Sequence, residues 1–200
     1  MLLNDIPQGI KGLIFDFDGT LCDTMPTHFM AWRNAVAPYG IDFTTELFDQ
    51  LAGIPVYGTI EELNRRFGTT MNPIELGNKK EEEYAQSMQL IKPIEPVLDV
   101  VKAFHGKLPM TVGTGGWRSL TEGILKILKL DHYFDAIITS EDVAKHKPHP
   151  ETFLMCAEKM QVAPKDCLVF EDGILGIQAA EACGMKWIDV RNYYEVTIGK

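Results

Sequence analysis

The chain has 200 residues, of which 46% are hydrophobic, and a formal net charge of -9 at pH 7. This length predicts one domain, or one domain that carries a smaller insertion, with enough apolar residues for a sizeable core. The negative charge disfavours nucleic acid or an anionic membrane as a partner, because both attract a basic protein face. The sequence contains no apolar run of about 18 residues and no signal-peptide pattern, so we expect a cytoplasmic protein, with a monomer favoured.

The first predicted strand, over residues 13–15, ends in two carboxylates. Asp16 and Asp18 are two residues apart on an extended chain, so their side chains point the same way. Like charges this close repel each other unless a cation or a shared proton offsets them, and Mg2+ prefers oxygen ligands. The pattern favours a Mg2+ site with a nucleophile or base beside it. Alternatively, the segment Asp-Phe-Asp-Gly-Thr only ends a strand, since Asp, Gly and Thr favour turns.

Residues 24–91 predict helices and no strand. Thr59 and Glu62 have the spacing of a capping box, which predicts a helix that begins at Thr59. Asn72 and the following proline predict the start of another helix. The expected helices cover residues 25–39, 45–52, 59–67 and 73 towards 91. We therefore interpret residues 24–91 as a separate helical domain, inserted after the first strand.

Residues 92–200 alternate between helix and strand. The expected strands are 110–113, 136–139, 167–170 and 187–190, and the expected helices are 96–105, 119 onward, 150–160 and 174–183. In the helix that starts near Ser119, we expect Leu120, Ile124 and Ile127 to face inward. Strands that alternate with helices predict an α/β fold with a doubly wound parallel sheet, a Rossmann-like core made of residues 1–23 and 92–200.

Ligands of such sheets bind beyond the carboxyl ends of the strands, so the residues that follow the strands are the candidates for a site. Thr114 offers a hydroxyl, and Gly115 and Gly116 offer backbone N–H groups for phosphate oxygens. Lys147 offers an ammonium, and Asp172 a third carboxylate for the cation. Taken singly, these residues also fit a turn, a surface lysine and a helix cap. Their joint position at strand ends favours a phosphoryl site.

These residues resemble the motifs of a known superfamily. Asp16-Phe17-Asp18-Gly19-Thr20, Thr114, Lys147-Pro148 and Glu171-Asp172 are similar to the four motifs of the haloacid-dehalogenase-like hydrolases. The resemblance covers nearly the whole chain and is greatest to the β-phosphoglucomutase and fructose-1-phosphate phosphatase group. It implies that the helical domain is a cap, which closes over the substrate and excludes bulk water.

The resemblance also implies a role for each core residue. Asp16 would be the nucleophile that becomes an aspartyl-phosphate, and Asp18 the general acid and base. Thr114 and Lys147 would hold the phosphoryl oxygens. The implied Mg2+ ligands are Asp16, the backbone carbonyl of Asp18, Asp172 and Glu171, the last directly or through water.

The cap residues are expected to choose the substrate, because the core residues contact only the phosphoryl group. His28 and Trp32 lie one helical turn apart, so one helix face can present both, and Lys80 could add a charge. We expect these three to contact the substrate. Trp32 has the alternative role of a core aromatic between the cap helices.

The resulting functional hypothesis is a Mg2+-dependent phosphatase of a small phosphorylated sugar, such as fructose 1-phosphate. The rivals are a sugar-phosphate mutase and a non-catalytic metabolite-binding module. In the mutases an arginine of the cap holds the second phosphate, and Val56 occupies the position where we expect it. This departure favours the phosphatase over the mutase.

Overall fold

The structure is a computed structural model that describes residues 1–51 and 53–195. The described residues divide into two compact units. We name residues 1–23 and 92–195 the core unit, and the described part of 24–91 the helical unit. The predicted end of the second helix at Ala52 lies outside the described residues.

The core unit contains a parallel sheet of five strands with the order β3-β2-β1-β4-β5. Phe15 of β1 lies between Val112 of β2 and Phe170 of β4, so the carboxyl ends of these three strands are neighbours. The prediction of a doubly wound α/β fold is confirmed. The strands are β1 (Gly12–Phe15), β2 (Met110–Gly113), β3 (Ala136–Ile138), β4 (Cys167–Glu171) and β5 (Lys186–Asp189).

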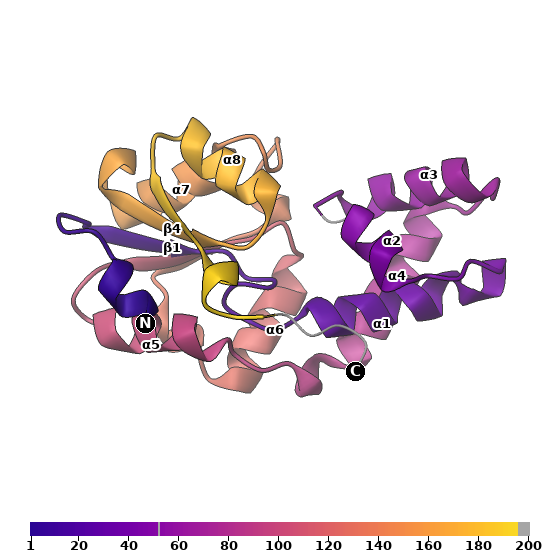
Figure 1. The fold of residues 1–200 in the computed structure, drawn as a ribbon, viewed down its shortest axis with the longest axis horizontal. Helices are drawn as coiled ribbons and strands as arrows, with labels where there is room; N and C mark the ends of the chain where they lie inside the picture. The colour runs from indigo at the N-terminus through magenta and orange to yellow at the C-terminus, as the bar shows by residue number, and fades with distance from the viewer. Residues whose placement is uncertain (52, 196–200) are drawn as a thin grey trace. The chain divides into compact units, whose positions relative to one another are not determined.

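Helices cover both faces of this sheet (Figure 1). The helices α7 and α8 lie on one face, where α7 contacts β1, β2 and β3, and α5 and α6 lie on the other. The bounds of these helices are α5 (Glu95–Phe104), α6 (Arg118–Leu128), α7 (Glu151–Met160) and α8 (Ile174–Ala182). Short 3-10 helices are η1 (Leu2–Asp5), η4 (Asp131–Tyr133), η5 (Ser140–Asp142), η6 (Pro164–Asp166) and η7 (Val190–Asn192).

Every residue of β1, β2 and β4 is buried, as expected for parallel strands covered on both faces. Ile14 and Val169 pack with Phe153 of α7 in one hydrophobic cluster. Their neighbours Phe15 and Phe170 point to the opposite face, since side chains alternate along a strand, and their rings stack with centroids 4.8 Å apart. The sheet is thus fixed from both sides, and so is the position of the residues that follow its strands.

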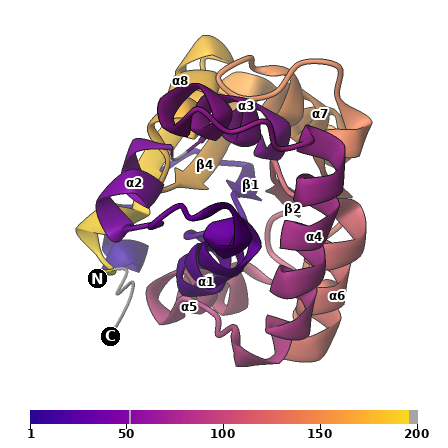
Figure 2. The same cartoon turned by 90° about the vertical axis from the view of Figure 1, so that its right-hand side faces the viewer.

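The helical unit consists of four α-helices, among the residues that are described, and of two short 3-10 helices. Their bounds are α1 (Met25–Val36), α2 (Thr45–Gln50), α3 (Val56–Phe67) and α4 (Pro73–Gln86), with η2 (Ala37–Tyr39) and η3 (Met88–Leu90). The helix α4 contacts both α1 and α3 (Figure 2). Asn72 caps α4, because its Oδ1 accepts the N–H of Ile74 at 2.9 Å, as the sequence predicts.

The predicted capping box at Thr59 is wrong, because α3 begins three residues earlier, at Val56. The Thr59 hydroxyl lies inside the helix and donates to the carbonyl of Ile54 at 3.2 Å. Glu62 accepts from Arg65 and Arg66 on the same helix instead of closing the helix start. The residue that precedes the helix is Pro55, and the φ that its ring fixes is compatible with this position. The spacing of Thr59 and Glu62 did not indicate this earlier start.

The predicted inward face of α6 is also partly wrong. Ile127 is 46% exposed, whereas Thr121, Ile124 and Leu125 are buried. The buried face of α6 is therefore rotated slightly about the helix axis from the predicted face. The periodicity predicts an apolar stripe, but the packing partners determine which of its residues are covered.

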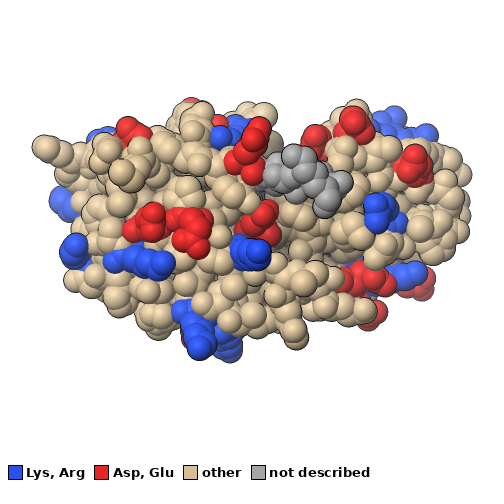
Figure 3. Space-filling model, turned by 60° about the horizontal axis from the view of Figure 1, so that its bottom comes forward, with Lys and Arg blue, Asp and Glu red and all other residues tan. Residues whose placement is uncertain are grey.

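Two observations describe the surface and the helices of the described residues. In the part of the chain that the structure describes, no helix is both long and apolar enough to cross a membrane. On the face drawn in Figure 3, the described Lys and Arg side chains are scattered between acidic ones and form no continuous basic surface. A basic face of the kind that binds nucleic acid is thus missing from this view.

The two isoleucines of α6 provide a test of this packing. Ile124→Ala should lower the free energy of unfolding by roughly 2–5 kcal/mol, since it opens a cavity in the core. Ile127→Ala on the exposed side should change it by about 0.5 kcal/mol or less. Urea denaturation of both variants measures the difference, and equal losses would contradict the described orientation of α6.

Candidate active site

The centre of the site is formed by two side chains, the buried Asp16 and the largely covered Lys147. Asp16 follows β1, and its N–H is held by the carbonyl of Phe170 on β4 at 3.0 Å. The Lys147 Nζ donates to Asp16 Oδ1 at 2.6 Å and to Glu171 Oε2 at 2.7 Å. Its side chain also lies over the ring of Phe153, with Nζ 4.6 Å from the centroid. One ammonium therefore links the ends of two neighbouring strands.

Glu171, the last residue of β4, is 3% exposed. Its second oxygen, Oε1, accepts the N–H of Gly173 at 3.0 Å. The helix α8 passes so close that a Cβ built on Gly176 would lie 2.1 Å from the carboxyl carbon of Glu171. Only a glycine at this position lets the helix approach the carboxylate.

Asp172 follows directly and is tied to the loop after β1. The Thr20 hydroxyl donates to Asp172 Oδ1 at 2.8 Å. Gly19 has a φ of +78°, and a Cβ on it would lie 2.4 Å from Asp172 Oδ2. Glycine is needed at this position both for its left-handed backbone and for the close approach of the carboxylate.

Burial and mutual repulsion raise the pKa values of the carboxyl groups of Asp16, Glu171 and Asp172. Burial is the largest cause that raises the pKa of Asp16, and the nearby Asp172 and Asp18 raise it further, while Lys147 opposes them. Burial and then Asp16 raise the pKa of Glu171, and burial and then Glu171 raise that of Asp172. Burial alone would lower the pKa of Lys147, but the charges of Asp16 and Glu171 outweigh it, and the pKa is raised. The single ammonium does not offset all the negative charge.

This donor set fits a hard divalent cation. Asp16, Glu171 and Asp172 each offer a carboxylate oxygen, and these oxygens lie within 4.8 Å of one another. Oxygen ligands with an excess of negative charge are what Mg2+ requires, and two positive charges would restore the balance that Lys147 alone leaves incomplete. The Asp18 carboxylate is not part of this group of three.

The loop after β2 lies beside Asp18. We name residues 114–116 the glycine loop. Thr114 is 1% exposed, and its Oγ1 donates to Asp18 Oδ2 at 3.4 Å and accepts the N–H of Gly116 at 2.9 Å. Gly115 is exposed. The structure thus brings Thr114 close to the carboxylates that follow β1.

The three residues expected to contact the substrate from the cap lie together in the helical unit. Lys80 is 1% exposed, and its Nζ lies 2.9 Å from His28 Nδ1 and 2.9 Å from Glu81 Oε1. It also lies over Trp32, 5.7 Å from the ring. Trp32 is 6% exposed and belongs to the hydrophobic core of the helical unit, as in its alternative interpretation.

Four residues of the site were missing from the sequence-based set. Thr20 donates a hydrogen bond to Asp172, and Gly19 leaves room for the Asp172 carboxylate. Both residues belong to the Asp-Phe-Asp-Gly-Thr segment, so the sequence contained a signal for them. Gly176 had a weaker signal, a glycine early in a predicted helix. Phe153 under Lys147 had none, because an apolar helix residue is ordinarily a core residue.

The fold places a cluster of carboxylates at the carboxyl edge of a parallel sheet, and comparison with known proteins gives the family. The model of the haloacid dehalogenase-like hydrolases matches residues 13–190, so the chain belongs to this family. The chain is similar to the fructose-1-phosphate phosphatase YqaB of Escherichia coli, with 44% identity over 90% of this chain and 96% of that protein.

Two further relatives are informative. The β-phosphoglucomutase of Bacillus subtilis is 29% identical over 88% of this chain and 81% of its own length. The crystal structure of CbbY from Rhodobacter sphaeroides in complex with phosphate has a TM-score of 0.78 and 22% identity, and the match covers 89% of this chain and 84% of that one. The last likeness supports the fold.

The raised carboxyl pKa values predict how pH and a cation change stability. The folded-state pKa values of the three carboxyls are about 7, above their values in the unfolded chain, so the folded state binds more protons between about pH 4 and 7. Without a cation, the contribution of the cluster to stability should therefore fall as pH rises through this window. Mg2+ at about 100 times its Kd should add about 2.7 kcal/mol at pH 8, or about 5–10 °C in Tm.

Thermal unfolding in Mg2+ and in EDTA at pH 5 and pH 8 measures this effect. The Mg2+ increment should be smaller at pH 5, because protons compete with the cation. Asp172→Asn should lose most of the increment at pH 8. Equal Tm values in Mg2+ and EDTA at pH 8 would show that the cluster holds no cation.

Proposed function

We propose that the protein is a Mg2+-dependent phosphatase of small phosphorylated sugars that works through an aspartyl-phosphate on Asp16. The observation that carries the proposal is the contact of Asp16 with Lys147 beside Glu171 and Asp172. Membership of the hydrolase family and the 44% identity to a fructose-1-phosphate phosphatase support it.

Asp16 is the nucleophile in this proposal. One of its carboxylate oxygens attacks the phosphorus, and the bond from phosphorus to the sugar oxygen breaks. The attack requires an ionised carboxylate, and Lys147 favours that form because it opposes the effect of burial on the pKa of Asp16. A Mg2+ ion held by Asp16, the Asp18 carbonyl, Asp172 and Glu171 would add positive charge beside the transferring group.

Asp18 is the proton carrier. Its carboxyl gives a proton to the leaving sugar oxygen, and its carboxylate then takes one from the water that attacks the phosphorus of the aspartyl-phosphate. Inorganic phosphate leaves, and Asp16 is restored. Thr114, 3.4 Å from Asp18, and the N–H groups of the glycine loop hold the phosphoryl oxygens together with Lys147.

The helical unit is the proposed cap, which selects the sugar. The core residues named above recognise a phosphoryl group, which every candidate substrate shares. His28 and Lys80, whose nitrogens are 2.9 Å apart, are the proposed polar contacts to the sugar. Trp32 would act by packing under Lys80.

A mutase is the second candidate, because a β-phosphoglucomutase is among the relatives. A mutase transfers the phosphoryl group to a second sugar oxygen and so must also hold a second phosphate. Val56, at the position where we expect the arginine for that phosphate, is apolar and packs against the hydrophobic core of the helical unit. This observation favours hydrolysis.

A screen of phosphate release over sugar phosphates, nucleotides and phosphoglycolate tests the proposal. The wild type should release inorganic phosphate from a sugar phosphate, and EDTA should stop the reaction. Asp16→Asn should lose more than about 90% of the activity, which corresponds to at least about 1.4 kcal/mol of barrier stabilisation, because an amide is a poor nucleophile. Conversion of glucose 1-phosphate without release of phosphate would instead establish the mutase, and no turnover of any kind would favour a binding module.

His28→Ala separates sugar recognition from phosphoryl chemistry. The Michaelis constant for the best sugar phosphate should rise, while hydrolysis of a small aryl phosphate should change little. Met30→Ala, at a position of the same helix that is 40% exposed, is the control and should leave both reactions unchanged. Equal losses on the two substrates would assign His28 to the chemistry or the fold.

A further inference from the structure

The glycine loop has little means of fixing its own orientation. Gly115 and Gly116 carry no side chains, and glycine is the least restricted residue in backbone conformation. The carbonyl of Gly116 is held from outside by Ser140, which donates both its N–H at 3.1 Å and its hydroxyl at 3.0 Å. A peptide group is planar, so this contact also fixes the direction of the N–H of Trp117 on the other side of the same peptide.

Ser140 is held in turn by Asp142. Ser140 begins η5, and Thr139 caps this helix together with Asp142. Asp142 Oδ2 accepts the N–H of Thr139 at 2.7 Å and its hydroxyl at 2.9 Å. The Asp142 carboxylate thus holds the start of η5, the short helix that contains Ser140.

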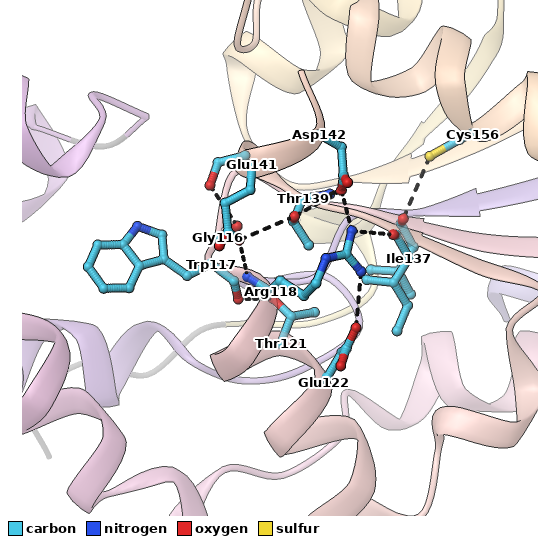
Figure 4. Close-up of polar contacts among 12 residues, drawn as sticks. Gly116, Trp117, Arg118, Thr121, Glu122, Ile137, Thr139, Glu141, Asp142 and Cys156 are labelled. Atoms are coloured by element: carbon cyan, nitrogen blue, oxygen red, sulfur yellow. Dashed lines mark hydrogen bonds and ion pairs between the residues drawn. The ribbon is translucent and has the colours of Figure 1, made fainter. Parts of the chain in front are cut away.

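Arg118 connects this turn to the helix that follows the glycine loop (Figure 4). Its Nη2 donates to Asp142 Oδ2 and to the carbonyl of Ile137, the latter at 3.3 Å. Its backbone N–H donates to Glu141 Oε2 at 2.6 Å, and its Nη1 to Glu122 at 3.0 Å. The side chain of Trp117 points away from these contacts in Figure 4. The last residue of the glycine loop and the start of α6 are therefore tied to the segment after β3.

We propose that Asp142 and Arg118 are positioning residues of the phosphoryl site, which act through Ser140 and the Gly116 carbonyl to orient the peptide between Gly116 and Trp117 and, with it, the N–H donors at this end of the glycine loop. The proposal rests on the proposed function, since it assigns those donors to phosphoryl oxygens. Neither side chain needs to touch the substrate.

Two magnitudes separate this role from a merely structural one. The side chains of Asp142 and Arg118 are 26% and 37% exposed, and ion pairs of this exposure contribute little to stability. In contrast, a misplacement of about 1 Å near the reacting group can cost about 100-fold in rate. Loss of the pair should therefore disturb the phosphoryl site more than it weakens the fold.

Calorimetric titration with inorganic phosphate in the presence of Mg2+ tests the proposal without requiring turnover. Asp142→Ala and Arg118→Ala should each raise the Kd for phosphate about fivefold or more, and the double variant should raise it no further, since both act through the same contact. A partly unfolded sample would lower the number of sites and leave the Kd unchanged. Asp142→Asn, which keeps an acceptor for Thr139, should recover part of the loss.

Asp166→Ala is the matched control. Asp166 is 23% exposed and forms an ion pair with Lys11 at 2.8 Å, in the same unit and away from the glycine loop. The Kd of the Asp166→Ala variant for inorganic phosphate should equal that of the wild type. A rise below about fivefold in Asp142→Ala, or an equal rise in Asp166→Ala, would overturn the positioning role.

Amide hydrogen exchange of the peptide that covers residues 114–120 separates this inference from the proposed function. Exchange there should be faster in Asp142→Ala than in the wild type or Asp166→Ala. If the wild type neither binds nor releases phosphate, the proposed function fails, and unchanged exchange would in addition disprove the positioning of the loop.

Discussion

The constraint on which the site depends is the confinement of three carboxyl groups around one largely covered ammonium. Lys147 contacts Asp16 and Glu171 at hydrogen-bond distance, and Asp172 lies beside them. Removing such charges from water is costly, and one lysine offsets only part of their mutual repulsion. Together with burial, the remaining imbalance explains the raised pKa values of the carboxyls and the fit of a divalent cation. In the proposed function, the feature that weakens the folded protein is the one that serves phosphoryl transfer.

The parallel sheet makes this confinement possible. Adjacent strands β1 and β4 end at the same edge, so residues far apart in the sequence become neighbours there without long, flexible loops. Two close approaches complete the arrangement. Gly19 admits Asp172, and Gly176 lets α8 pass beside Glu171, and any larger residue would separate the carboxylates from each other or from their partners.

The chain divides into two units, and in the proposed function each unit has a different role. The core unit contains the carboxylates, the lysine and the glycine loop, which in the proposed function act on the phosphoryl group. The helical unit has a core of its own around Trp32 and a buried Lys80 paired with Glu81. In the proposed function this second unit supplies the contacts that distinguish one sugar from another.

The sequence by itself determined the α/β class, the sheet and the order of Asp16, Thr114, Lys147 and Asp172 along it, because strand periodicity and chemistry at strand ends are local signals. It missed the start of α3 and the exposure of Ile127, since these depend on which residues pack around a helix. Only the tertiary structure decided that Lys147 links Asp16 to Glu171, that Phe153 lies beneath it, and that Asp142 reaches the glycine loop through Ser140. Such contacts join side chains across the chain, and no pattern within a short segment specifies them.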